Sequence, residues 1–174
     1  MKYIRKLEKK DAPLMLEWMH DIEIVKNFSV RFNEYTANDV KKFIEESFND
    51  YNRHFAIINE KDEYLGTISL KNISKEDKNA EYAVVCRKCA QGTGISQQAT
   101  REILAYAFDE LGLERVYLNV LEENIRACKF YEKVGFKKEG VFQRHKNIQG
   151  RLQNLCWYGM LKDTLRVEEE YESI

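Results

Sequence analysis

The stretch from residue 81 to residue 111, EYAVVCRKCAQGTGISQQATREILAYAFDEL, decides the fold. Its first residues favour a strand that ends at Cys86, and from Ile95 onward apolar residues recur every four positions, which predicts one face of a helix. Gly92 and Gly94 lie between them. Glycines directly before a helix let backbone N–H groups approach a ligand, and the positive end of the helix dipole favours a phosphate. The unit predicts either a phosphate-binding turn or an ordinary tight turn.

On both sides of this unit the chain alternates between strands and helices. The predicted strands are residues 3–6, 54–59, 64–70, 80–86, 115–121, 136–142 and 152–161, and the predicted helices are 12–28 (one or two), 36–48, 95–111 and 124–135. Thr36 opens a capping signal, and Gly112 is placed to end a helix. This order predicts an α/β (α+β) fold with a mixed sheet, and the length of 174 residues fits a single domain, residues 1–174.

Charge and composition narrow the function classes. The 28 Lys and Arg nearly balance the 29 Asp and Glu, so the chain lacks the basic excess that is typical of nucleic-acid binding. No apolar run approaches the roughly 20 residues of a membrane-spanning helix, and no apolar signal core follows the N-terminus. The four cysteines are too few for a disulfide framework. We therefore expect a cytoplasmic protein with neither a nucleic-acid nor a membrane partner.

A second segment, residues 119–136, predicts a strand, a turn and a helix. Asn124, Ala127 and Tyr131 lie at positions i, i+3 and i+7, so they share one face of that helix. The small alanine between two hydrogen-bonding side chains leaves room for a thin ligand along this face. The alternative is a tyrosine at the edge of a core helix with its hydroxyl bonded to water.

Together the two segments resemble the GNAT N-acetyltransferase superfamily, and the resemblance covers nearly the whole chain. The superfamily's cofactor motif, Q/R-x-x-G-x-G/A, corresponds to residues 91–96, QGTGIS, with serine at its last position. Its second motif, N-x-x-A-x-x-x-Y-x-x-x-G-F, is present as Asn124, Ala127, Tyr131, Gly135 and Phe136. The two ends of the chain are similar to the branch that contains ribosomal-protein, spermidine and amino-sugar acetyltransferases.

The resemblance implies a mostly antiparallel central sheet flanked by helices, and acetyl-CoA as the cosubstrate without a metal. It implies that the cofactor-binding residues are Val84, Val85, Cys86, Gln91, Gly92, Thr93, Gly94, Ile95, Ser96, Asn124, Ala127 and Tyr131. The turn would bind the pyrophosphate and the strand would bind the pantetheine arm. Tyr131 is the predicted general acid, and either Glu81 or a water chain is the predicted base. Cys86 and Cys89 have metal-ligand spacing but lack a second ligand pair, which argues against zinc.

The acceptor amine stays open. A small-molecule amine is expected, either an amino-sugar nucleotide or a polyamine, and the N-terminal amine of a ribosomal protein is the alternative. Arg31, Arg144 and Lys146 could bind a diphosphate, whereas the carboxylates available for a polyamine are Asp21, Glu23 and Glu34. A further alternative is a non-catalytic acyl-CoA sensor. Related enzymes form homodimers, so a homodimer is a possible assembly.

Overall fold

A seven-stranded sheet forms the frame of the protein, in the order β1-β2-β3-β4-β5-β7-β6. The computed structural model describes residues 2–28 and 30–164. The strands are β1 (Ile4–Lys6), β2 (Arg53–Ile58), β3 (Tyr64–Ser74), β4 (Asn79–Cys86), β5 (Arg115–Leu121), β6 (Lys137–Ile148) and β7 (Arg151–Leu161). Neighbouring strands are antiparallel except β4 and β5, which are parallel. The predicted mixed, mostly antiparallel sheet is thereby confirmed.

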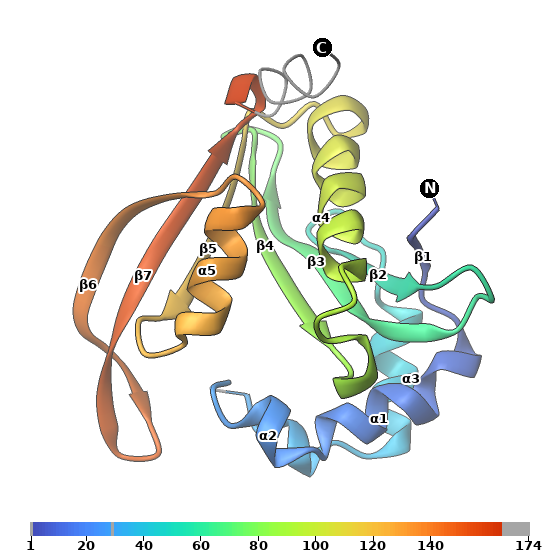
Figure 1. Ribbon diagram of the computed structural model, residues 1–174. Helices are drawn as coiled ribbons and strands as arrows, with labels where there is room; N and C mark the ends of the chain where they lie inside the picture. Colours follow the sequence, from blue (N-terminus) through green and yellow to red (C-terminus); the bar gives the residue numbers. More distant parts are fainter. Residues whose placement is uncertain (1, 29, 165–174) are drawn as a thin grey trace.

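Helices cover both faces of the sheet (Figure 1). The helices are α1 (Ala12–Met19), α2 (Ile22–Val25), α3 (Ala37–Glu45), α4 (Ile95–Ala105) and α5 (Ile125–Lys133). The larger core cluster joins α4 and α5 to one face, where every second strand residue, such as Tyr82 and Leu118, is buried. The smaller cluster packs α1 and α3 on the opposite face, against Ala56 and Val85. This alternation follows from the two-residue period of side chains along a strand.

The parallel pair β4 and β5 opens into a wedge. Asn79–Glu81 pair with Arg115–Tyr117, and no pairing between the two strands continues beyond these residues in the described part of the chain. From that apex the strands diverge toward the lower edge of the view in Figure 1. β4 remains paired with β3, and β5 with β7, so each strand is held on its outer side. We call this opening the wedge.

The structure refines several predicted boundaries. The predicted helical region of residues 12–28 contains two helices, α1 and α2, and ends at Val25 rather than at residue 28. Asp21 is the N-cap of α2, and its carboxylate accepts from the backbone N–H of Glu23 at 3.0 Å. The predicted capping signal is a capping box between Thr36 and Asp39. Its helix ends at Glu45, so the predicted extension to residue 48 is wrong.

The long predicted helix of residues 95–111 changes character near its end. α4 is α-helical only as far as Ala105, and Tyr106–Glu110 form a π-helical turn. The last hairpin is longer than predicted, since its strands run to Ile148 and from Arg151. Short 3-10 turns occur at Lys9–Asp11, Phe32–Glu34 and Lys88–Ala90. In residues 2–28 and 30–164 no helix is long and apolar enough to cross a membrane.

Candidate active site

The glycine-rich turn of residues 91–96 sits at the N-terminus of α4, beside the open end of the wedge. Gly92 has φ +80° and Gly94 has φ +84°, so both adopt the left-handed conformation that side-chain-bearing residues avoid. Gly94 is also the N-cap of α4. The predicted turn therefore needs glycine at both positions for a conformational reason.

Several backbone donors of this turn are free. The N–H groups of Gly92, Gly94 and Ser96 have no hydrogen-bond partner within the described ranges. The residues between them are engaged, because Thr93 N–H donates to Ala90 O and Ile95 N–H to Thr93 Oγ1, both at 3.4 Å. Unpaired N–H groups at the positive end of a helix dipole form a site for an anion such as a pyrophosphate.

The strand predicted to hold the pantetheine arm presents an unpaired edge to the wedge. Residues 84–86 pair with β3 on one side only, so the N–H and C=O groups that point away from β3 have no strand partner in the described part of the chain. Val84 and Cys86 face α4 and α5, whereas Val85 faces α1. The Cys86 thiol lies 3.0 Å from the Ser96 hydroxyl, which ties this strand to the turn.

Tyr131 reaches the same space from α5. Its side chain is buried, and its ring lies edge-on to that of Tyr82, with centroids 6.1 Å apart. The hydroxyl forms no hydrogen bond to a described residue. It is not fully buried either, so it is in contact with solvent. Burial, with smaller effects from Cys128 and Cys86, raises the pKa of Tyr131 above its ordinary value of 10. The phenol therefore keeps its proton at neutral pH.

The N-terminus of α5 closes the mouth of the wedge against the turn. Asn124 caps the helix, with its Oδ1 accepting from the Ala127 N–H at 3.2 Å. The guanidinium of Arg126 donates to Gln91 Oε1 at 2.7 Å and so spans the two predicted cofactor segments. Arg126 is not among the predicted cofactor-binding residues, although a cation in the first turn of this helix was the available signal.

Glu81 lies away from this group. It occupies the apex of the wedge and points to the face opposite Tyr82, where it accepts from Lys71 at 2.9 Å and from Asn72 at 2.8 Å. The structure thus brings together the turn, the edge of β4 and Tyr131, but not Glu81 and Tyr131. Its role as the base stays a prediction.

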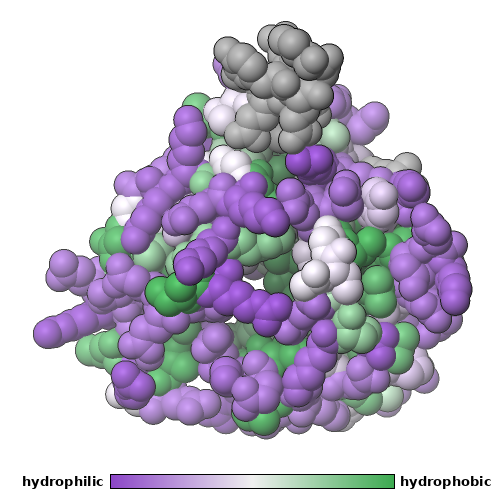
Figure 2. Space-filling model, in the orientation of Figure 1, coloured by the Kyte–Doolittle hydropathy of each residue, from purple (hydrophilic) through white to green (hydrophobic). Residues whose placement is uncertain are grey.

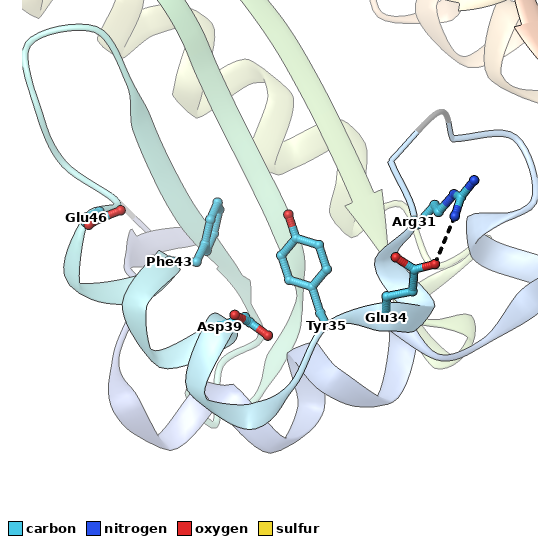
Figure 3. A pocket seen from close by; sticks show the side chains of 6 residues that line it. All are labelled: Arg31, Glu34, Tyr35, Asp39, Phe43 and Glu46. Atoms are coloured by element: carbon cyan, nitrogen blue, oxygen red, sulfur yellow. Dashed lines mark hydrogen bonds and ion pairs between the residues drawn. The ribbon is translucent and has the colours of Figure 1, made fainter.

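The space-filling view shows the wedge as an indentation with hydrophobic residues inside a hydrophilic rim (Figure 2). Two further hollows occur among the described residues. One, of about 710 Å³, adjoins the turn and is lined partly by Arg87, Thr93 and Gly94. The other, of about 530 Å³, is lined by Arg31, Glu34, Tyr35, Asp39, Phe43 and Glu46 (Figure 3). Its carboxylates are already engaged: Glu34 pairs with Arg31 at 3.2 Å, and Asp39 accepts from Thr36. The described residues contain no group of three or more His, Cys, Asp or Glu that could hold a metal.

Known proteins share this architecture. The acetyltransferase (GNAT) domain family matches residues 3–137. Spermidine N(1)-acetyltransferase of Vibrio cholerae is 29% identical over 87% of this chain and 88% of its own length. A putative ribosomal N-acetyltransferase of Bacillus subtilis, YdaF, is 29% identical over 91% of this chain and 90% of its own. The crystal structure of the V. cholerae spermidine enzyme with CoA and spermine superposes with a TM-score of 0.85 at 22% identity, covering 94% of this chain and 96% of that one.

Proposed function

The chain belongs to the acetyltransferase (GNAT) domain family, and on that premise we propose how its wedge performs acetyl transfer. The protein is an acetyl-CoA-dependent N-acetyltransferase. We place the pyrophosphate on the free N–H groups of the turn, and the pantetheine arm along residues 84–86. We add Arg126 to the residues that contact the pyrophosphate, because its guanidinium already donates to Gln91 in the turn.

The observation that carries this proposal is the wedge itself. One wall is a strand edge without a pairing strand, and the opposite wall carries a buried tyrosine whose hydroxyl has no hydrogen-bond partner, both as far as the described residues go. An extended arm can add to such an edge through main-chain hydrogen bonds. The thioester at its end would then lie beside Tyr131, whereas an ordinary core tyrosine would have no reason to border an open strand edge.

The chemistry is direct transfer. The neutral acceptor amine attacks the thioester carbonyl carbon, and a free N–H of β4 stabilises the oxyanion of the tetrahedral intermediate. The nitrogen of this intermediate releases one proton to solvent, and collapse then breaks the C–S bond and leaves the neutral amide. Tyr131 donates its proton to the departing thiolate and regains one from solvent. A thiol has an ordinary pKa near 8.5, so this acid lowers the barrier without being indispensable.

The proton of the amine needs a separate route. An amine with a pKa near 10.4 is roughly one part in two thousand neutral at pH 7, so a base or a water chain must assist. We propose Glu81 as that base, acting through water because its carboxylate is held by Lys71 and Asn72. Replacing Glu81 with Gln should shift the acidic limb of the pH–rate profile. If the acidic limb does not shift, the water chain remains as the only route for the amine proton.

The acceptor is proposed to be a small-molecule primary amine. The spermidine relatives support this choice, and the ribosomal relative keeps a protein N-terminus as the alternative. Cytoplasmic location is part of the same proposal, because the cysteines Cys86, Cys89, Cys128 and Cys156 are all free.

The test is release of CoA thiol and mass-spectrometric detection of acetylated product after incubation with acetyl-CoA. The amine pool would contain spermidine, glucosamine, amino-acid amides and short peptides with free N-termini. Product with at least one amine supports the proposal. Acetyl-CoA binding without product from any of them would favour the non-catalytic sensor.

A further inference from the structure

The face of the wedge opposite α4 and α5 carries a row of aromatic side chains. Tyr117 of β5, Trp157 of β7 and Phe142 of β6 lie side by side, with ring centroids 6.0 Å apart between the first pair and 5.4 Å between the second. We call these residues the aromatic row. Tyr117 pairs with Glu81 at the apex, so the row begins where the wedge begins.

Strand alternation fixes which way the row points. Cys156 and Tyr158 belong to the core cluster under α5, so Trp157 between them points to the other face. Over β2–β4 that face is covered by α1 and α3, whose cluster contains Ala56 and Val85. Neither cluster includes a residue of the aromatic row. The row is therefore partly open, and Phe142 is 49% exposed.

Trp157 carries an unused donor. Its indole Nε1 is the only buried side-chain nitrogen or oxygen without a hydrogen-bond partner in residues 2–28 and 30–164. Buried polar groups nearly always have partners, so such an exception requires a reason. Gly140 pairs with Trp157 across β6 and β7, and apart from its chain neighbours no atom of the described residues lies within 4 Å of the place its side chain would occupy. Nε1 itself is buried, so a ligand that lies beside the ring reaches this donor when the indole turns.

The charged side chains around the aromatic row are paired with one another. Glu81 is paired with Lys71, and Glu139 with Arg115. The Arg115 guanidinium also lies over the Tyr117 ring, 6.0 Å from its centroid, where it already occupies a cation–π position and repels a second cation. A polyamine, which keeps further positive charges beyond the reacting amine, finds no free carboxylate among these groups.

The two faces of the wedge have different roles in the proposed reaction. The free N–H groups of the turn and Tyr131 assign the cofactor to the α5 side, which leaves the opposite side for the approach of the amine. Resting on the proposed function, we infer that the aromatic row binds the acceptor. The acceptor is a primary amine with an uncharged apolar arm and an oxygen that accepts from the Trp157 N–H. Amino-acid amides have this chemistry, because amine, carbonyl and apolar side chain lie within a few bonds.

The first test uses the protein's own fluorescence. The chain has 2 tryptophans. Trp18 is 3% exposed and donates to the Tyr64 hydroxyl at 2.8 Å, so acceptor binding should alter only the emission of Trp157. With CoA present, phenylalaninamide should change the emission of the wild type in a saturable way, and Trp157→Phe should abolish the change. Spermidine should produce little change. An equal response in Trp157→Phe would overturn the inference.

The second test is kinetic, with phenylalaninamide and spermidine as the amines. We expect phenylalaninamide to have the higher kcat/KM. Trp157→Phe keeps a ring but loses the donor, and should raise the KM for phenylalaninamide about 3- to 10-fold while the acetyl-CoA Kd stays constant. Trp18→Phe is the matched control: it loses an indole N–H inside the core and should lower Tm without changing that KM.

The outcomes separate this inference from the proposed function. Transfer that proceeds best with spermidine and is insensitive to Trp157→Phe would overturn the acceptor class and leave the transferase intact. No thiol release with any amine would overturn both. A lower Tm with unchanged KM in Trp157→Phe would show that the residue serves only packing.

Discussion

The two faces of the wedge present different kinds of chemical groups, backbone atoms on one and side chains on the other. On the α5 side the polar groups are mainly backbone atoms, namely the unpaired N–H groups of the turn and the edge of β4, joined by the Tyr131 hydroxyl. On the opposite side the surface is made of side chains, with the aromatic row at its centre. Backbone groups can bind the part of a cosubstrate that never changes, whereas side chains can be exchanged without altering the fold. Specificity for the cosubstrate and specificity for the acceptor can therefore be changed separately.

The largest expected effect comes from Tyr131. Replacing Tyr131 with Phe removes the proton donor but keeps the ring that packs against Tyr82. The value of kcat should fall about 10²- to 10⁴-fold, the usual range for one acid–base group, while the acetyl-CoA Kd stays near that of the wild type. Stopped-flow thiol release and calorimetric binding would check both. Unchanged turnover would remove the tyrosine from the chemistry.

The pH dependence is the next largest effect. The fraction of neutral amine rises about tenfold per pH unit below its pKa. From pH 7 to pH 9, kcat/KM should therefore rise about 100-fold for an amine with a pKa near 10.4, but only about 6- to 10-fold for an α-amine with a pKa near 8, such as that of phenylalaninamide. Burial raises the pKa of Tyr131 above 10, so the acid stays protonated throughout and causes no decline in this interval. A decline between pH 8 and pH 9 that disappears in Tyr131→Phe would show that the phenol ionises there.

A change in the turn should affect the cosubstrate alone. Gly94→Ala places a side chain at φ +84°, which costs roughly 1–2 kcal/mol and disfavours the conformation that aims the N–H groups. The acetyl-CoA Kd should rise about 5- to 30-fold with little change in the acceptor KM. Gly150→Ala is the matched control, because Gly150 has φ +85° in the distant β6–β7 turn. An equal loss of affinity in the control would mean that general destabilisation, not the turn, is responsible.

The smallest expected effect lies on the acceptor face. Phe142→Ala removes an exposed ring that packs on Trp157, and such aromatic contacts contribute about 0.5–1.5 kcal/mol. The acceptor KM should rise about 2- to 12-fold in steady-state assays with phenylalaninamide, with the acetyl-CoA Kd constant. Tyr51→Ala, a side chain that is 69% exposed and outside the wedge, should change neither value. A weaker acetyl-CoA affinity in Phe142→Ala would contradict the separation of the two faces.

The cofactor side could be predicted because its signals are local. The residues that form the turn are contiguous, and Asn124, Ala127 and Tyr131 lie within one helix, so spacing alone places them on one face. Thr36 and its capping box were predictable for the same reason.

The acceptor side could not be predicted, since it depends on strand register. Tyr117, Phe142 and Trp157 meet only because β7 lies between β5 and β6, an order that local patterns do not reveal. The pairing of Glu81 with Lys71 likewise follows from the β3–β4 register. The π-helical turn after Ala105 left no signal in the apolar period.

A crystal structure with bound CoA tests the central claim most directly. We expect the pyrophosphate to accept hydrogen bonds from the N–H groups of Gly92, Gly94 and Ser96. We also expect the pantetheine arm to follow residues 84–86 and the thiol to lie beside the Tyr131 hydroxyl. Coenzyme bound elsewhere, or a thiol on the far side of the wedge among the aromatic row, would contradict it.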